Sequence, residues 1–373
     1  MTPPALTTAE LNRATLARQL LLERASGVGV VDAVQRLAGM QAQEPKHPFV
    51  GLWTRLEDFD EVALHAALDE RSVVRATLMR STLHLLGAAD YAALRMALQP
   101  PPSVALRVLG ARAEGLDPEK VLPAARALLE GLPLTFDEIR QHLQEQFPGV
   151  NDRALGYAVR TLLPLVMVPD EDARWGFGRA ARFTLAERWL DAPLADGEAA
   201  ARALARRYLG AFGPASAKDL QAWSGAGGMK GVLDGMRDEL AVFTDEGGGR
   251  RELFDLPDAP RPAADVPAPS RLLPEFDNLV LAWDDRSRVI ATEHRPLVTT
   301  KNLRVKATFL VDGAVAGVWT IALKRRVATL TLSPFGPKAL PKRLLGELQA
   351  EAERLVRLVE PEARDHAVAV ASE

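Results

Sequence analysis

The strongest constraint on the fold is a unit that recurs three times along the first 256 residues: short amphipathic helices followed by two β-like runs joined by a loop. In the first copy, the β-like runs are Val73–Leu78 and Thr82–Leu86. This order is typical of a winged helix-turn-helix module. Because one copy could arise by chance but three spaced copies are harder to explain that way, we predict tandem winged helices at 1–100, 101–192 and 193–256.

Capping signals support the helices within these copies. Thr7 lies three residues before Glu10, which is the spacing of a capping box. Thr135-Phe136-Asp137-Glu138 is a plausible cap for the helix that follows, and Asn151 or Asp152 is the expected cap of the recognition helix of the second copy. We expect helices after Glu10 and at 30–40, 49–56, 61–68, 118–130, 135–147, 151–163, 198–212, 216–223 and 231–238. In the second and third copies, two strands flank each wing. We expect strands 166–168 and 182–185 on either side of the wing 170–179. We expect strands 240–243 and 252–254 on either side of the wing 245–251.

The hydrophobic period changes after residue 271. Five prolines between Leu256 and Arg271 indicate a linker, which we place at 257–271. Beyond it, apolar residues predict strands at 279–281, 288–290, 305–310, 315–321 and 327–332. Asp312-Gly313 favours a hairpin, and leucine spacing predicts a closing helix over 341–359. The predicted fold class is therefore α+β, with three winged helices followed by a small β-barrel-like domain at 272–373.

Composition excludes several classes of site. The 373 residues include no cysteine, which rules out disulfide frameworks, thiolate zinc sites, iron–sulfur clusters and a cysteine nucleophile. The histidines lack the spacing of metal ligands, so we expect no metal and no cofactor. No run of about 18 apolar residues exists, and Met1–Glu10 lacks the apolar core of a signal peptide. We therefore expect a cytoplasmic protein that does not enter a membrane.

Two glutamines separated by one small residue stand at the end of the second predicted helix, as Gln41-Ala42-Gln43. Each amide offers two hydrogen-bond donors and one acceptor oxygen. Two such groups together can hold a water molecule and direct it at an electrophilic carbon. On residue types alone, however, a polar helix end is the simpler explanation of this segment.

The glutamine segment and four others resemble the bacterial AlkZ/YcaQ family of winged-helix DNA glycosylases. The other similar segments are Leu11–Arg13, Met79–His84, Leu272–Asn278 and Asp285–Arg288, and the resemblance covers essentially the whole chain. The family motif is glutamine, an apolar residue, and then glutamine or aspartate; the form found here is similar to the AlkZ branch. One departure is Ser81, where the family most often has glycine.

The resemblance implies a monofunctional DNA glycosylase that hydrolyses the N-glycosidic bond of N7- or N3-alkylated purines and that could also unhook interstrand crosslinks. It implies that Gln41 and Gln43 position the nucleophilic water. An alkylated purine is cationic and leaves readily, so a strong general acid is less necessary. The expected partner is double-stranded DNA, bound by a monomer at the nucleoid. The candidate DNA contacts are His47, Arg80, His84, Arg286, Arg288, Lys324 and Arg325.

Net charge bears on this expected partner. Lysine and arginine total 46 against 49 acids, which gives a formal net charge of −3. An even distribution of charge would count against a DNA-binding protein, whereas arginines gathered in one channel would not. We therefore expect a modest and strongly salt-dependent affinity for undamaged DNA.

Two other functions stay open on the sequence alone. Winged helices occur mostly in regulators, and a fold does not fix an activity, so the main alternative is a non-catalytic transcriptional regulator. The other is a resistance protein that sequesters a drug. Sequence-specific binding of undamaged DNA without base release would favour the regulator, and tight small-molecule binding without DNA would favour the resistance protein.

Overall fold

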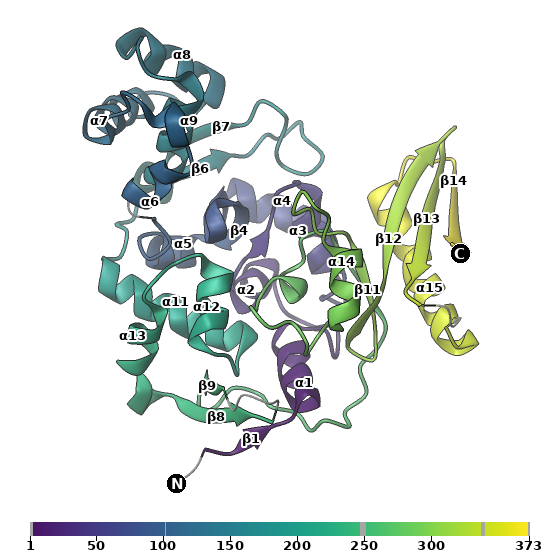
Figure 1. The fold of residues 1–373 in the computed structure, drawn as a ribbon. Coiled ribbons are helices and arrows are strands. Elements are labelled where there is room, and N and C mark those ends of the chain that lie inside the picture. The colour runs from purple at the N-terminus through teal and green to yellow at the C-terminus, as the bar shows by residue number, and fades with distance from the viewer. Residues whose placement is uncertain (1–2, 101, 247–250, 337–339, 372–373) are drawn as a thin grey trace.

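The computed structural model describes residues 3–100, 102–246, 251–336 and 340–371. A mixed α+β body carries the last sheet and helix of the chain along one side (Figure 1). The first hundred residues form β1 (Ala5–Leu6), α1 (Thr8–Arg18), α2 (Val30–Arg36), β2 (Met40–Gln41), α3 (Lys46–Trp53), α4 (Glu61–Asp69), β3 (Val73–Thr77), the 3₁₀ helix η1 (Met79–Ser81), β4 (Leu83–Gly87) and α5 (Ala88–Leu94).

The first two regions confirm predicted helix caps, and the second region carries two of them. The elements of the second region are α6 (Pro102–Arg107), η2 (Gly110–Ala113), α7 (Pro118–Leu129), β5 (Leu134–Thr135), α8 (Phe136–Gln146), α9 (Asp152–Leu162), β6 (Leu165–Val168), β7 (Arg182–Leu185) and α10 (Ala186–Leu190). Thr7 and Thr135 each complete a capping box, and the Asn151 side chain caps α9. These side chains satisfy backbone N–H groups that a helix end leaves unpaired.

One six-stranded antiparallel sheet joins the first two regions. Its strand order is β2-β4-β3-β6-β7-β5, and the seam between the regions is the pairing of Arg75 on β3 with Met167 on β6. The two predicted β-hairpins thus belong to a single sheet, and a shared apolar core packs against it. Strand β2, which carries Gln41, is an edge strand of this sheet.

The third region packs on the first and recruits the N-terminus. It forms α11 (Gly197–Phe212), α12 (Ala217–Ser224), α13 (Met229–Asp234), η3 (Arg237–Glu239), β8 (Ala241–Asp245) and β9 (Glu252–Asp255). Strand β1 pairs with β8 in parallel, and Arg18 of α1 binds Asp255 of β9 through two buried hydrogen bonds of 2.7 and 2.8 Å. Residues 247–250 of the expected third wing lie outside the described residues.

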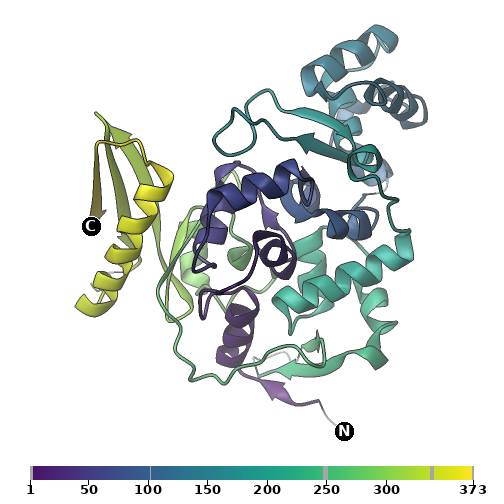
Figure 2. The same ribbon diagram turned by 180° about the vertical axis from the view of Figure 1, so that it is seen from behind.

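The C-terminal region is an open sheet, which corrects the barrel-like prediction. It forms β10 (Arg271–Leu273), η4 (Asn278–Val280), η5 (Thr292–His294), α14 (Arg295–Val298), β11 (Thr308–Val311), β12 (Ala314–Lys324), β13 (Val327–Pro334), α15 (Lys342–Val359) and β14 (Asp365–Val370). The order is β10-β11-β12-β13-β14, and within the described residues the two edge strands do not pair to close a barrel. Helix α15 lies along one face of the sheet (Figure 2).

Two predicted strands in this region are wrong. Residues 279–281 lie mostly in the 3₁₀ helix η4, and 288–290 lie in a turn. Both apolar runs are buried in the main core, where Leu279 and Val289 have no exposed surface. These two runs are apolar because they are buried in the core, although neither of them forms a strand. The Asp312-Gly313 hairpin is confirmed: both residues have positive φ, 47° and 79°, as a type I′ turn requires.

No helix in the described ranges combines the length and the apolar character needed to span a bilayer.

Candidate active site

The first glutamine of the pair lies on β2, where Gln41 pairs in register with His84 of β4. The chain reaches β2 through a sharp turn after α2, in which Ala38 and Gly39 have left-handed backbone with φ of 55° and 82°. Only glycine fits at position 39, because a Cβ atom there would lie 2.2 Å from the Leu86 side chain. The turn holds Gln41 at the sheet edge with 6% of its surface exposed.

Arg80 of η1 fixes the side chain of Gln41. Its Nη2 donates to Gln41 Oε1 over 3.0 Å, and its Nη1 donates to the backbone oxygen of Trp223 in α12. Gly225, which ends α12 with φ 76°, permits this approach, because a Cβ there would lie 3.1 Å from Arg80 Cα. Burial, followed by the charge of Arg286, lowers the pKa of Arg80 to about 10. Arg80 therefore stays cationic at neutral pH.

The second glutamine, Gln43, is exposed just beyond β2. Arg75 of β3 holds the backbone of this segment: its Nε donates to the oxygen of Ala42 at 2.9 Å and its Nη2 to that of Gln43 at 3.1 Å. Among the described residues, no partner hydrogen-bonds the Gln43 side chain. The backbone of Gln43 is thus fixed, while its amide is available to a ligand or water.

The segment Leu272–Asn278 clamps the turn that precedes Gln41. Asn278 Nδ2 donates to the backbone oxygens of Leu37 and Gly39, at 3.2 and 2.5 Å. Beside it, Asp277 accepts two hydrogen bonds from Arg55, at 2.8 and 2.9 Å, and both side chains are almost fully buried. Residues from the C-terminal region therefore determine where the glutamine strand lies.

Both glutamines line a cleft of about 460 Å³. Its lining residues are Gln41, Gln43, Glu44, Thr77, Ser81, Thr82, Leu83, Arg160, Glu275, Phe276, Asn302, Leu303 and Arg304. The lining also includes Asn302, Leu303 and Arg304 of the turn 300–304, which lies between the bridged residues Thr299 and Val305. Leu303 in this turn is 78% exposed, which is unusual for a large apolar side chain beside a polar cleft.

Several residues in or beside this cleft have left-handed backbone. Arg80, Ser81, Phe276 and Leu303 have φ of 53°, 57°, 57° and 60°. Such conformations cost non-glycine residues about 1–3 kcal/mol each and cluster at functional sites. The value at Ser81 also explains why glycine suits that position.

His47 and His84, two predicted DNA contacts, lie in the interior. They are 3% and 0% exposed. Burial is the main reason that the pKa of each falls to about 3, and nearby cations add to it: Lys46 for His47 and Arg80 for His84. Both imidazoles are therefore neutral at physiological pH. This placement supports packing, rather than contact with a DNA phosphate, as the role of His84.

The remaining predicted DNA contacts divide into buried and exposed groups. Arg288 is 5% exposed and lies over the ring of Trp283 at 4.8 Å, and Arg286 is half-buried and donates to the Trp283 backbone oxygen at 3.3 Å. Lys324 and Arg325 are exposed at the turn between β12 and β13. The structure does not bring any of these four residues into the lining of the glutamine cleft.

Four residues that line the cleft, Arg160, Glu275, Leu303 and Arg304, were not part of the predicted site. Glu275 and Arg304 form an ion pair, with oxygen–nitrogen distances of 2.9 and 3.0 Å. One signal was available, because Glu275 belongs to the segment Leu272–Asn278 that carries the family resemblance.

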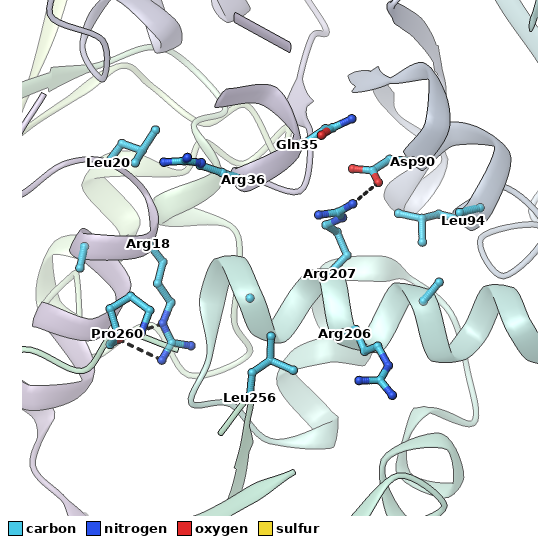
Figure 3. A pocket seen from close by; sticks show the side chains of 14 residues that line it. Arg18, Leu20, Gln35, Arg36, Asp90, Leu94, Arg206, Arg207, Leu256 and Pro260 are labelled. Carbon is cyan, nitrogen blue, oxygen red and sulfur yellow. Dashed lines mark hydrogen bonds and ion pairs between the residues drawn. The ribbon is translucent and has the colours of Figure 1, made fainter. Parts of the chain in front are cut away.

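A second cavity of about 610 Å³ shares no lining residue with the glutamine cleft (Figure 3). Helices α1, α2, α5 and α11 line it. Three of its arginines already have acidic partners: Arg207 binds Asp90, Arg18 binds Asp255, and Arg206 binds Glu239. The cavity lacks the paired amides, so we place the chemistry in the glutamine cleft.

In the part of the chain that the structure describes, no group of three or more histidine, aspartate or glutamate side chains is arranged to hold a metal ion.

Two amides, a partly basic rim and an exposed apolar tip around one cleft suit attack of water on a sugar carbon of DNA. The fold is that of a DNA glycosylase. The chain belongs to the AlkZ-like DNA glycosylase family, whose model matches residues 34–358.

Two relatives from Streptomyces sahachiroi agree with this assignment. An interstrand DNA cross-link repair glycosylase is 28% identical over 314 residues, which are 80% of this chain and 84% of the relative. The solved structure of the DNA glycosylase AlkZ matches with a TM-score of 0.78 and 23% identity, over 98% of this chain and 100% of that chain, and is a likeness of fold. These findings support the glycosylase and not the transcriptional regulator.

Proposed function

We propose that this protein hydrolyses the N-glycosidic bond of N7- or N3-alkylated purines in double-stranded DNA, acting as a monomer at the nucleoid. Interstrand crosslinks made by such alkylation belong to the same substrate class, and the crosslink repair relative supports their inclusion. The observation that carries the proposal is the fixed amide of Gln41, held by Arg80 at the edge of a cleft that Gln43 also lines.

The contact with Arg80 gives the two glutamines different roles. A guanidinium is only a donor, so the oxygen of the Gln41 amide must face Arg80, and its NH₂ group is left to face the cleft. That NH₂ group can donate to the oxygen of a water molecule and hold it. The Gln43 amide makes no such contact within the described chain, so its oxygen can accept a hydrogen bond from the same water.

This arrangement suits hydrolysis of a cationic base. The C1′–N bond breaks and its electron pair goes to the purine, which neutralises the charge that alkylation introduced. The water oxygen bonds to C1′, and its proton passes to bulk water, because an amide is not a base. The sugar becomes oxocarbenium-like as the bond breaks, and the amide oxygen of Gln43 provides a dipole that stabilises the positive charge.

The turn 300–304 and the turn between β12 and β13 are the surfaces that we assign to DNA. Leu303 projects from the first turn beside the glutamine cleft, and apolar side chains of this kind can wedge between base steps in the minor groove. Lys324 and Arg325 are exposed on the second turn, where they suit contact with phosphates, which position a protein without reading sequence. We do not assign DNA contact to the buried Arg288.

Single-turnover base release from duplexes that each contain one N7-methylguanine, N3-methyladenine or mustard-crosslinked guanine pair tests the proposal. Gln41→Ala and Gln43→Ala should each lower the release rate by about 10²–10³. Gln141 is an exposed glutamine on α8, and the control variant Gln141→Ala should not change the release rate. Release from none of the three lesions by the unaltered protein, or unchanged release in the Gln41/Gln43 double variant, would refute the assignment.

A further inference from the structure

A smaller pocket of about 300 Å³ adjoins the glutamine cleft, between α3 and the C-terminal sheet. Six of its eleven lining residues are apolar, namely Val50, Pro274, Ala307, Trp319, Ile321 and Val359. This size is at the lower end of the range of about 300–1,000 Å³ that is typical of small-molecule sites. The pocket can thus hold a compact group, but not a large one.

The pocket and the cleft share a wall. Glu275 and Arg304 line both of them, and their ion pair stands where the two spaces meet. The Arg304 side chain is 62% exposed, and an exposed pair of this kind is held by about 1 kcal/mol or less. A group that enters from the cleft can therefore displace the pair at little cost.

His47 gives the pocket a polar group that the folded chain leaves unsatisfied. Neither ring nitrogen has a hydrogen-bond partner among the described residues, although the residue is almost fully buried. A neutral imidazole offers one donor and one acceptor, and leaving such groups unpaired in the interior costs free energy. Occupied pockets usually combine an apolar lining with a few polar groups of this kind.

We propose that this pocket receives the substituent carried by the alkylated purine, and that it selects lesions with a compact, mostly apolar arm. The proposal rests on the proposed function, since the purine must lie at the glutamines for its arm to reach past Glu275 and Arg304. The pocket then determines which adducts fit, while the two amides perform the hydrolysis.

Two duplexes test the pocket, one containing a single N7-benzylguanine and the other a single N7-methylguanine. Both purines carry the same charge and differ only in the arm. Thr320→Trp places a large ring at the exposed rim of the pocket. It should lower the ratio of benzyl to methyl release by at least about tenfold, the range of discrimination that a hydrophobic pocket provides. Ala322→Trp is the matched control, because Ala322 is exposed on the same strand and does not line the pocket.

The outcomes separate the two proposals. A lower ratio in Thr320→Trp with an unchanged ratio in Ala322→Trp supports the pocket. An unchanged ratio in Thr320→Trp, an equal fall in the ratio for both variants, or an unaltered protein that releases methylated but not benzylated guanine would overturn it. Failure of the unaltered protein on both duplexes and on the lesion panel above would instead reject the proposed function. If Thr320→Trp does not fold, Thr320→Phe provides the same comparison with a smaller ring.

Discussion

The guanidinium of Arg80 donates to the side-chain oxygen of Gln41 over 3.0 Å, and its other terminal nitrogen donates to a backbone oxygen of α12. The α12 partner, Trp223, lies 143 residues further along the chain. A helix of the third region therefore braces a side chain of the first region. Because arginine cannot accept a hydrogen bond, this one contact determines which end of the Gln41 amide faces the cleft.

Arg80→Met should lower kcat for base release by about 100-fold, since a small misplacement of a catalytic group has an effect of that size. KM for the duplex should change little, because Arg80 orients Gln41 and its charge is directed inward. Arg325→Met is the comparison, since it removes an exposed cation and should instead weaken DNA binding. A raised KM with unchanged kcat in Arg80→Met would show that Arg80 is a DNA contact.

Gln43→Glu should retain more activity at pH 7 than Gln41→Glu. A carboxylate at position 43 keeps the acceptor oxygen, whereas at position 41 it loses the NH₂ donor and pairs with Arg80. Single-turnover rates across pH should also show that Gln43→Glu loses activity below about pH 4–5, where glutamate becomes protonated. The opposite order of activities at pH 7 would mean that the two amides exchange these roles.

Asp277→Ala should lower the free energy of unfolding by about 3–5 kcal/mol, because it leaves the buried charge of Arg55 without its partner. Asp234→Ala breaks an exposed pair with Lys230 and should cost about 0–1 kcal/mol. Urea denaturation of both variants measures the difference. Equal effects would show that the Arg55–Asp277 pair contributes no more than a surface pair.

Stability should decline as the pH falls below about 6.5. The pKa of His47 and of His84 is about 3 in the folded protein and 6.5 when unfolded, so the unfolded chain takes up these protons first. The contribution is complete above pH 6.5 and is lost progressively toward pH 3. At pH 5, each histidine should lower the free energy of unfolding by about 2 kcal/mol relative to neutral pH. Urea denaturation at pH 7 and pH 5 checks this, and the His47→Gln/His84→Gln double variant should show a smaller difference than the unaltered protein.

Leu303→Asn should lower kcat/KM on duplex lesions by about tenfold, because the apolar wedge is lost. Asparagine tolerates the left-handed backbone at this position, so the turn should keep its shape. Leu132→Asn provides the control, since Leu132 is 76% exposed and lies outside the cleft. If Leu303→Asn releases bases at the original rate, the turn 300–304 does not enter the DNA.

Local signals predicted much of the secondary structure. The strand over 182–185, the capping box at Thr7 and the cap at Thr135 were correct because each depends on residues within one short segment. The parallel pairs β1–β8 and β13–β14 were not predicted, because such partners are distant in sequence and leave no mark on either strand alone. The same reason explains why the open edge of the last sheet was not foreseen.

In the candidate site, too, local signals were informative and contacts between distant residues were not foreseen. Spacing and resemblance predicted Gln41 and Gln43 as the catalytic pair, and the structure places both in one cleft. They did not reveal that His84 is fully buried, because β4 is covered on both faces and its residues do not alternate between core and solvent. Nor did they reveal the role of Arg80, whose partners are 39 and 143 residues away.

The clamp between Asn278 and Gly39 has a consequence for the timing of biosynthesis. These two residues are 239 positions apart, so a ribosome translating at roughly 5–20 residues per second needs about 12–48 s to add Asn278 after Gly39. During that interval, the glutamine strand exists without the residue that holds its turn. A nascent or truncated chain that ends before residue 278 should therefore contain both glutamines and still have no glycosylase activity.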